Sequence, residues 1–116
     1  MTNIEPELTM ETQLGPEAAA VRHILTTPSI NRRCAPYLSV DGVDWYGLLG
    51  EAETMSTGEQ LLVKLASDLD ARESGVTVWE LSQRLGRPTF DRVLEALELV
   101  RGDRVAHRLE ALPDAA

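Results

Sequence analysis

The chain has 116 residues with a formal net charge of −8, and 43% of its residues are hydrophobic. This length predicts a single domain with a modest core, and the hydrophobic content excludes wholesale disorder. The acidic excess argues against non-specific binding to nucleic acids, because a negative surface repels phosphate groups unless a basic patch overrides it.

The apolar residues favour helices and offer nothing that would cross a membrane. They are mainly Leu, Val and Ala, with only five aromatic residues in the chain, a mix that suits helices better than sheets. No run of 18 apolar residues occurs, and the acidic start does not resemble a signal peptide. The single cysteine, Cys34, excludes an internal disulfide. We therefore expect an all-α protein of the cytoplasm.

The first half of the chain predicts two helices separated by an irregular segment. Residues 1–15 are polar, acidic and aperiodic, so we expect a flexible tail in front of one helical domain over residues 16–112. Proline at its start and glutamate in its first turn favour a helix over residues 16–25. Residues 29–42 show no period and are expected to be irregular. Asp44 then caps a short helix. Its expected buried face is Trp45, Leu48, Leu49 and Ala52.

A longer helix follows from Ser56. The sequence Ser56-Thr57-Gly58-Glu59 has the form of a capping box, in which hydroxyl and carboxylate satisfy backbone donors reciprocally. Apolar residues then recur at helical spacing, while Lys64 is expected to face water. The expected buried face is Leu61, Leu62, Leu65, Ala66 and Leu69.

Residues 77–102 have the outline of a helix-turn-helix. Thr77 opens a second capping box, and Gly86 is expected to end that helix in the left-handed conformation. Thr89 is expected to cap the next helix, which Gly102 ends. The expected inward faces are Val78, Leu81 and Leu85 on the first helix, and Phe90, Val93, Leu94, Leu97 and Val100 on the second.

The predicted fold is a small all-α bundle of about five helices with a helix-turn-helix-like unit at residues 77–102. A last short helix is expected over residues 104–112, where Val105, Leu109 and Leu112 recur at helical spacing. The alternative for this stretch is the hairpin of a winged helix, although the alternation typical of a strand is missing.

The helix-turn-helix outline raises the question of DNA binding, because the second helix of such a unit enters the major groove. The candidate DNA contacts on this interpretation are Arg84, Arg87, Thr89 and Arg92. Asp91 and Glu95 are expected on the same outer face, where they would repel phosphate groups. The charges therefore favour a helix pair that packs or binds protein.

Groups that could carry out catalysis are scarce. Neither His23 nor His107 belongs to a spacing typical of a metal site. Cys34 follows two arginines that favour a thiolate, but the sequence offers no neighbouring base. The pairs Asp41/Asp44 and Glu51/Glu53 lack the alternating oxygen ligands of a calcium loop. We expect no enzymatic activity, no cofactor and no metal ion.

The remaining candidates are aromatic. Trp45, Tyr46 and Trp79 are either core anchors or interface residues, since tryptophan and tyrosine are common hot spots. Our leading hypothesis is a small non-enzymatic accessory or regulatory protein that binds another protein or forms a homodimer; its size and acidity fit a phage or mobile-element product. One alternative is a helix-turn-helix DNA-binding transcriptional regulator. A second is an acidic DNA mimic that inserts the acids of residues 41–73 into a basic channel.

Overall fold

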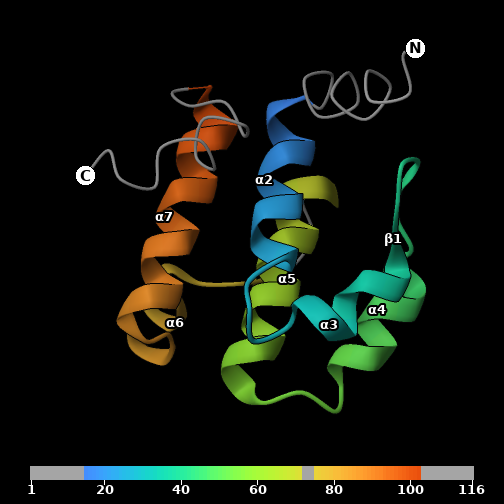
Figure 1. Ribbon diagram of the computed structural model, residues 1–116. Helices are drawn as coiled ribbons and strands as arrows, with labels where there is room; N and C mark the ends of the chain where they lie inside the picture. The colour runs from blue at the N-terminus through green and yellow to red at the C-terminus, as the bar shows by residue number, and fades with distance from the viewer. Residues whose placement is uncertain (1–14, 72–74, 103–116) are drawn as a thin grey trace.

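The computed structural model describes residues 15–71 and 75–102, which fold into six α-helices and one very short β-hairpin (Figure 1). The predicted all-α bundle is confirmed. Residues 1–14 of the tail predicted at residues 1–15 lie outside the described residues, as does the predicted helix at residues 104–112. The helices are α2 (Pro16–Leu25), α3 (Asn31–Cys34), α4 (Trp45–Ala52), α5 (Thr57–Ala71), α6 (Val78–Arg84) and α7 (Arg87–Arg101).

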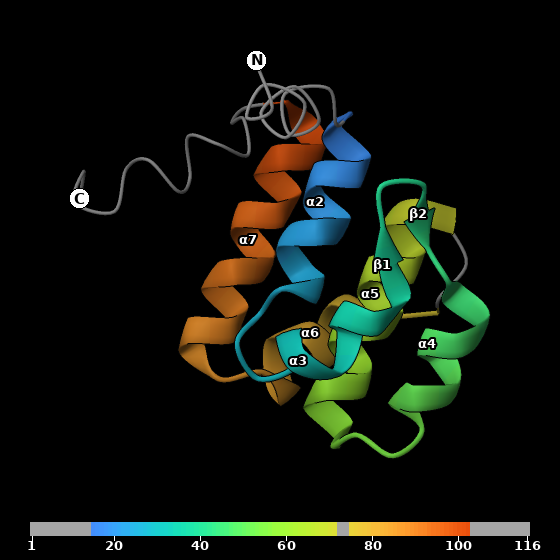
Figure 2. The ribbon, with the colours of Figure 1, turned by 45° about the vertical axis from the view of Figure 1, so that its right-hand side comes forward.

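Helix α2 lies between the two longest described helices and packs against both (Figures 1 and 2). The predicted bounds of this helix are confirmed, with proline in the first turn and Thr26 just beyond the last. Ile24 and Leu25 are fully buried, and Ala20 is small enough to let a neighbouring helix come close. The core around α2 consists of Ala20, Val21, Ile24, Leu25, Ile30, Cys34, Leu48, Ala52, Met55, Leu62, Val63, Leu65, Ala66, Val93, Ala96 and Leu99.

The expectation that residues 29–42 are irregular was wrong. They form α3, a 3₁₀ helix (Ala35–Tyr37), and two antiparallel strands, β1 (Leu38–Ser39) and β2 (Gly42–Val43). Gly42 has a φ of 131° at the reversal, a conformation that glycine adopts without strain. A helix of four residues and strands of two are too short to leave a period in the sequence, so pattern analysis missed them.

Helix α4 is capped as the sequence predicts, and a glycine lets the 3₁₀ helix lie against it. The Asp44 carboxylate accepts a hydrogen bond of 3.1 Å from the Gly47 N–H. A side chain at Gly47 would place its Cβ 2.7 Å from the Tyr37 ring, so a larger residue there would clash. Leu48 and Ala52 are buried as expected, but Leu49 is exposed because it lies on the solvent side of the helix.

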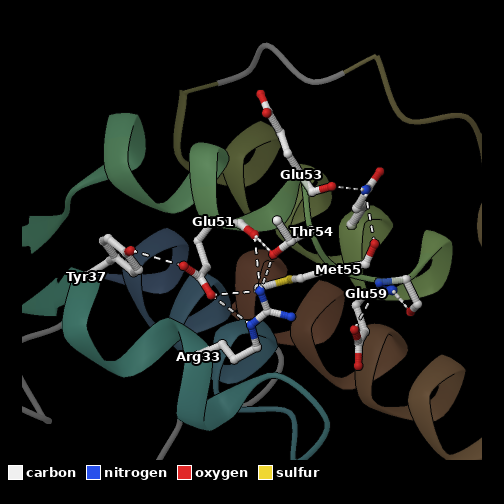
Figure 3. Close-up of polar contacts among 9 residues, drawn as sticks. Arg33, Tyr37, Glu51, Glu53, Thr54, Met55 and Glu59 are labelled. Carbon is white, nitrogen blue, oxygen red and sulfur yellow. Dashed lines mark hydrogen bonds and ion pairs between the residues drawn. The ribbon is translucent and has the colours of Figure 1, made fainter.

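A polar network joins this part of the chain to the loop before α5 (Figure 3). The Arg33 Nε donates to the Glu51 carboxylate at 2.8 Å, and the same guanidinium donates to the Thr54 hydroxyl. The Tyr37 hydroxyl donates to the other Glu51 oxygen at 3.4 Å. Desolvation, followed by the negative charge of Glu51, raises the pKa of the Tyr37 phenol above its ordinary value. Glu51 therefore has a structural role between α3, the 3₁₀ helix and α4.

The capping box before α5 is confirmed. The Glu59 N–H donates to the Ser56 hydroxyl at 3.2 Å, and the Ser56 N–H donates to the Glu59 carboxylate at 3.1 Å. Lys64 is exposed. Val63 is also buried, which the amphipathic pattern did not predict, because α2, α4 and α6 all pack on α5. The predicted residues Leu61, Leu62, Leu65 and Ala66 are buried, and Leu69 is half-buried.

The helix-turn-helix-like order of α6 and α7 is confirmed, but two expected helix ends were wrong. The Thr77 capping box is present. The chain is already extended at Leu85, and Gly86 has a φ of −72°, so Gly86 precedes α7 as its N-cap instead of ending α6 in the left-handed conformation. Thr89 lies inside the first turn of α7, where Pro88 suits the fixed φ of a helix start. Gly102 ends α7 in the left-handed conformation with a φ of 86°, as expected.

The first prediction tests the buried face of α5. We expect Leu65→Ala to lower the free energy of unfolding by about 2–4 kcal/mol, because the lost burial is compounded by the cavity left behind. The neighbouring Lys64→Ala should change it by less than about 0.5 kcal/mol. Denaturant titration of both variants measures the difference, and equal effects would refute the assignment of the buried face.

Candidate functional site

Two polar residues of α7, Arg92 and Glu95, contact α2 beside the buried apolar face of α7. The Arg92 Nε donates to the carbonyl oxygen of His23 at 3.0 Å, and its Nη2 donates to the Thr26 hydroxyl at 3.1 Å. The His23 Nε2 lies 2.8 Å from a Glu95 carboxylate oxygen. These contacts are part-buried and join the C-terminal turn of α2 to the middle of α7, so they fix how α7 is rotated about its own axis.

This rotation corrects the expected faces of α7. Glu95 is not on the outer face with Asp91, because it is half-buried against His23. Ala96 and Leu99 are buried, although neither was expected to be. The face that packs on α2 is therefore shifted around the helix from the predicted one, and two leucines predicted to be buried are exposed: Leu94 by 42% and Leu97 by 38%.

Three of the four candidate DNA-binding residues contact other residues of the chain, and the fourth is half-buried. Arg92 is bound to the end of α2, as described above. Arg87 is exposed and lies 3.2 Å from the Asp91 carboxylate one turn along α7. The Arg84 guanidinium lies over the Trp79 ring, 5.7 Å from its centroid. Thr89 is the half-buried residue. Of the four residues, Arg84 and Arg87 are exposed to the solvent.

Helix α6 presents two apolar residues, Val78 and Trp79, to the solvent. None of its residues is buried. Val78, expected to be on the inner face, is 82% exposed, and Trp79 is 61% exposed. The half-buried Leu81 is the inward residue of the helix. The Trp79 indole N–H has no hydrogen-bond partner within residues 15–71 and 75–102.

The sequence indicates Trp79 as a candidate but does not predict its pairing with Arg84. The two residues are five apart, a spacing outside the three- and four-residue rule for neighbours on a helix. Trp79 lies in the first turn of α6, a helix of seven residues, and Arg84 is the last residue of that helix. A cation over a tryptophan face is an attractive arrangement.

The other two aromatic candidates differ from each other. The Trp45 indole N–H donates to the Asp70 carboxylate at 2.6 Å, which ties the start of α4 to the end of α5. Trp45 is half-buried and packs on the core, so it is an anchor. Tyr46, the next residue, is 94% exposed. Helices α4 and α6 both pack on α5 and lie on different sides of it (Figure 1).

The thiol and the acidic residues that the sequence offered as candidates lie in surroundings that give them structural roles. Cys34 is fully buried, and this burial raises the pKa of its thiol to about 11 despite the neighbouring Arg33 charge. The Asp44 and Glu51 carboxylates accept the hydrogen bonds described above. Within the described ranges, no three His, Cys, Asp or Glu side chains are grouped as a metal ion would require.

Two of the clefts on the described part of the chain lie beside α2 and beside α5. One, of about 350 Å³, lies between α2 and the hairpin, and has Arg22, Asp41 and Asp70 as its charged lining residues. It has the volume of a small-molecule site, but its described lining contains no imidazole, thiol or paired carboxylic acid. The other, between α5 and α6, is about 100 Å³, below the usual range for a ligand pocket.

Neither family models, nor curated proteins, nor solved structures gave a match to this chain. None of the described helices has the length and apolar character needed to span a bilayer.

The second prediction compares two arginines of α7. We expect Arg92→Ala to lower the free energy of unfolding by about 1–3 kcal/mol, because it removes charged donors and leaves the part-buried His23 carbonyl and Thr26 hydroxyl without them. Arg87→Ala removes only an exposed ion pair and should cost less than about 0.5 kcal/mol. Thermal and denaturant unfolding of both variants measures this, and a larger loss for Arg87→Ala would refute the rotation of α7.

Proposed function

We propose that the protein is a non-enzymatic accessory protein that acts by binding another protein through α6, with Trp79 as the central contact. The observation that carries the proposal is that Trp79 and Val78 are both exposed on a helix that buries none of its own residues. A tryptophan that belongs to the core of a domain is seldom exposed to this extent. An exposed apolar surface of this kind is typical of an interaction site.

The surroundings of Trp79 support an interface. Tryptophan and arginine are the side chains that most often dominate binding energy, and Arg84 lies against the Trp79 ring. The capping box of Thr77 and Glu80 holds the first turn of α6, so Trp79 projects from a fixed backbone. A side chain that is already positioned loses less conformational entropy when a partner binds.

The DNA-binding alternative receives less support from the same surface. A reading helix needs side chains at its start that reach base edges, and Arg92 is instead bound to α2. Arg87 is beside Asp91, which opposes the phosphate attraction on which non-specific affinity depends. The DNA-mimic alternative requires acids that are open to a basic partner. Within residues 41–71, Asp44, Glu51, Glu59 and Asp70 accept hydrogen bonds inside the molecule.

The third prediction tests the Trp79 surface. A photo-reactive or chemical cross-linker carried by the full chain in cells of its source should capture a specific protein, or a second copy, and Trp79→Ala should reduce that capture at least about tenfold. A loss of this size corresponds to about 1.4 kcal/mol, more than truncation of most interface residues costs.

The matched control is Gln83→Ala, an exposed change on the same helix. It should leave capture unchanged, and circular dichroism should show equal helicity in both variants. The proposal is contradicted if the captured protein persists with Trp79→Ala, or if both variants lose it equally. Sedimentation over a range of concentrations distinguishes a homodimer from a different partner.

A further inference from the structure

The cleft of about 350 Å³ between α2 and the hairpin of β1 and β2 has the features of a binding site. The hairpin stands beside α2 in Figure 2, and we call the space between them the hairpin cleft. Its volume is near the lower end of the usual range for small-molecule sites, about 300–1,000 Å³. The hairpin cleft therefore suits a small ligand, and its lining residues indicate which kind.

Charges of both signs line the hairpin cleft without pairing. Arg22 belongs to the last turn of α2, Asp41 to the turn of the hairpin, and Asp70 to the last turn of α5. The Arg22 guanidinium donates to the Ser39 carbonyl oxygen at 3.4 Å, and the Asp70 carboxylate accepts from the Trp45 indole N–H at 2.6 Å. Both of these partners are neutral. Over residues 15–71 and 75–102, none of the three charged side chains forms an ion pair.

A ligand that carries a carboxylate and an ammonium group complements this arrangement. A guanidinium can bind a carboxylate through two parallel hydrogen bonds, and Arg22 uses only its Nη2 for the bond to Ser39. The Asp41 carboxylate accepts no hydrogen bond from the described part of the chain, so it is available to an ammonium group. Hydrogen bonds between charged groups are about twice as strong as those between neutral groups.

The apolar part of the lining indicates the side chain of the ligand. It is aliphatic and consists of Ala18, Val21, Leu38, Val40 and Val43. Val21 is buried and forms the inner wall, whereas Val40, next to Asp41, is 69% exposed. An aliphatic group bound here would remove apolar surface from water on both sides of the cleft, which favours binding in proportion to the area covered.

We propose that the hairpin cleft binds a free α-amino acid with an aliphatic side chain. Arg22 binds its carboxylate, Asp41 and Asp70 bind its ammonium group, and the aliphatic lining contacts its side chain. Helix α6 contributes no residue to the lining, so this site is independent of the Trp79 surface.

The test compares three ligands that differ in their charges. L-Leucine carries both charges, isoamylamine is the same molecule without the carboxylate, and isocaproate is the same molecule without the amino group. Each is titrated into the full chain, and binding is followed by the amide chemical shifts. L-Leucine should bind at least about tenfold more tightly than either of the others, because each of these lacks one set of charge-assisted hydrogen bonds. The largest shift changes should occur in residues 38–43 and in the last turn of α2.

Two variants assign the carboxylate of the ligand to its partner. Arg22→Gln should bind L-leucine no more tightly than isoamylamine, because the side chain that distinguishes the two ligands has lost its charge. Arg32→Gln is the matched control, since it removes the same charge from an exposed arginine of α3 that does not line the hairpin cleft. It should change the affinity for L-leucine by less than about twofold.

Four results would overturn the proposal. They are an absence of saturable binding at millimolar L-leucine, an affinity for isoamylamine or isocaproate equal to that for L-leucine, shift changes confined to α6, and equal losses with Arg22→Gln and Arg32→Gln. The last of these would show that binding follows the overall charge of the protein. The comparison of the three ligands on the wild-type chain needs no variant, so it decides the question even if Arg22→Gln lowers the stability.

Discussion

Burial of α2 between α5 and α7 is the constraint on which the rest of the molecule depends. Helix α2 has ten residues, and half of them are buried, including the fully buried Ile24 and Leu25. Full burial of such a side chain is worth about 1.5–3 kcal/mol, so these contacts are a large part of the stability of a small domain. The two longest described helices, α5 and α7, both pack on α2. The two sides of α2 therefore determine which faces of α5 and α7 remain exposed.

The polar contacts between α2 and α7 determine which side chains α7 presents to the solvent. Apolar packing alone allows a helix to rotate by a fraction of a turn, whereas hydrogen bonds from Arg92 to His23 and Thr26 select one rotation. That rotation turns Leu94 outward. Helix α6 packs on α5, so Trp79 remains exposed at the other end of the same unit. The two exposed surfaces thus follow from one packing arrangement.

Local signals in the sequence predicted most of the helices, and tertiary contacts explain the errors. The capping boxes at Ser56 and Thr77 are formed by neighbouring residues, so they could be recognised without the fold. Periodicity located α7 but misplaced its buried face, because Leu94, Leu97 and Leu99 carry the same hydrophobic signal and only the packing against α2 distinguishes them. Val78 was misassigned because α6 is too short for periodicity to define a face. The sequence indicated Trp79 as a candidate, and only the structure shows its exposure.

The most direct test of this account is a double-mutant cycle between His23 and Glu95, which lie 72 positions apart in the chain and 2.8 Å apart in the structure. Free energies of unfolding are measured for His23→Ala, Glu95→Ala and the double variant. The account predicts a favourable coupling above about 0.5 kcal/mol, as for residues in contact, and none for the same cycle between His23 and Asp91. Additive effects for His23 and Glu95, or coupling to Asp91 instead, would show that α7 is rotated differently against α2.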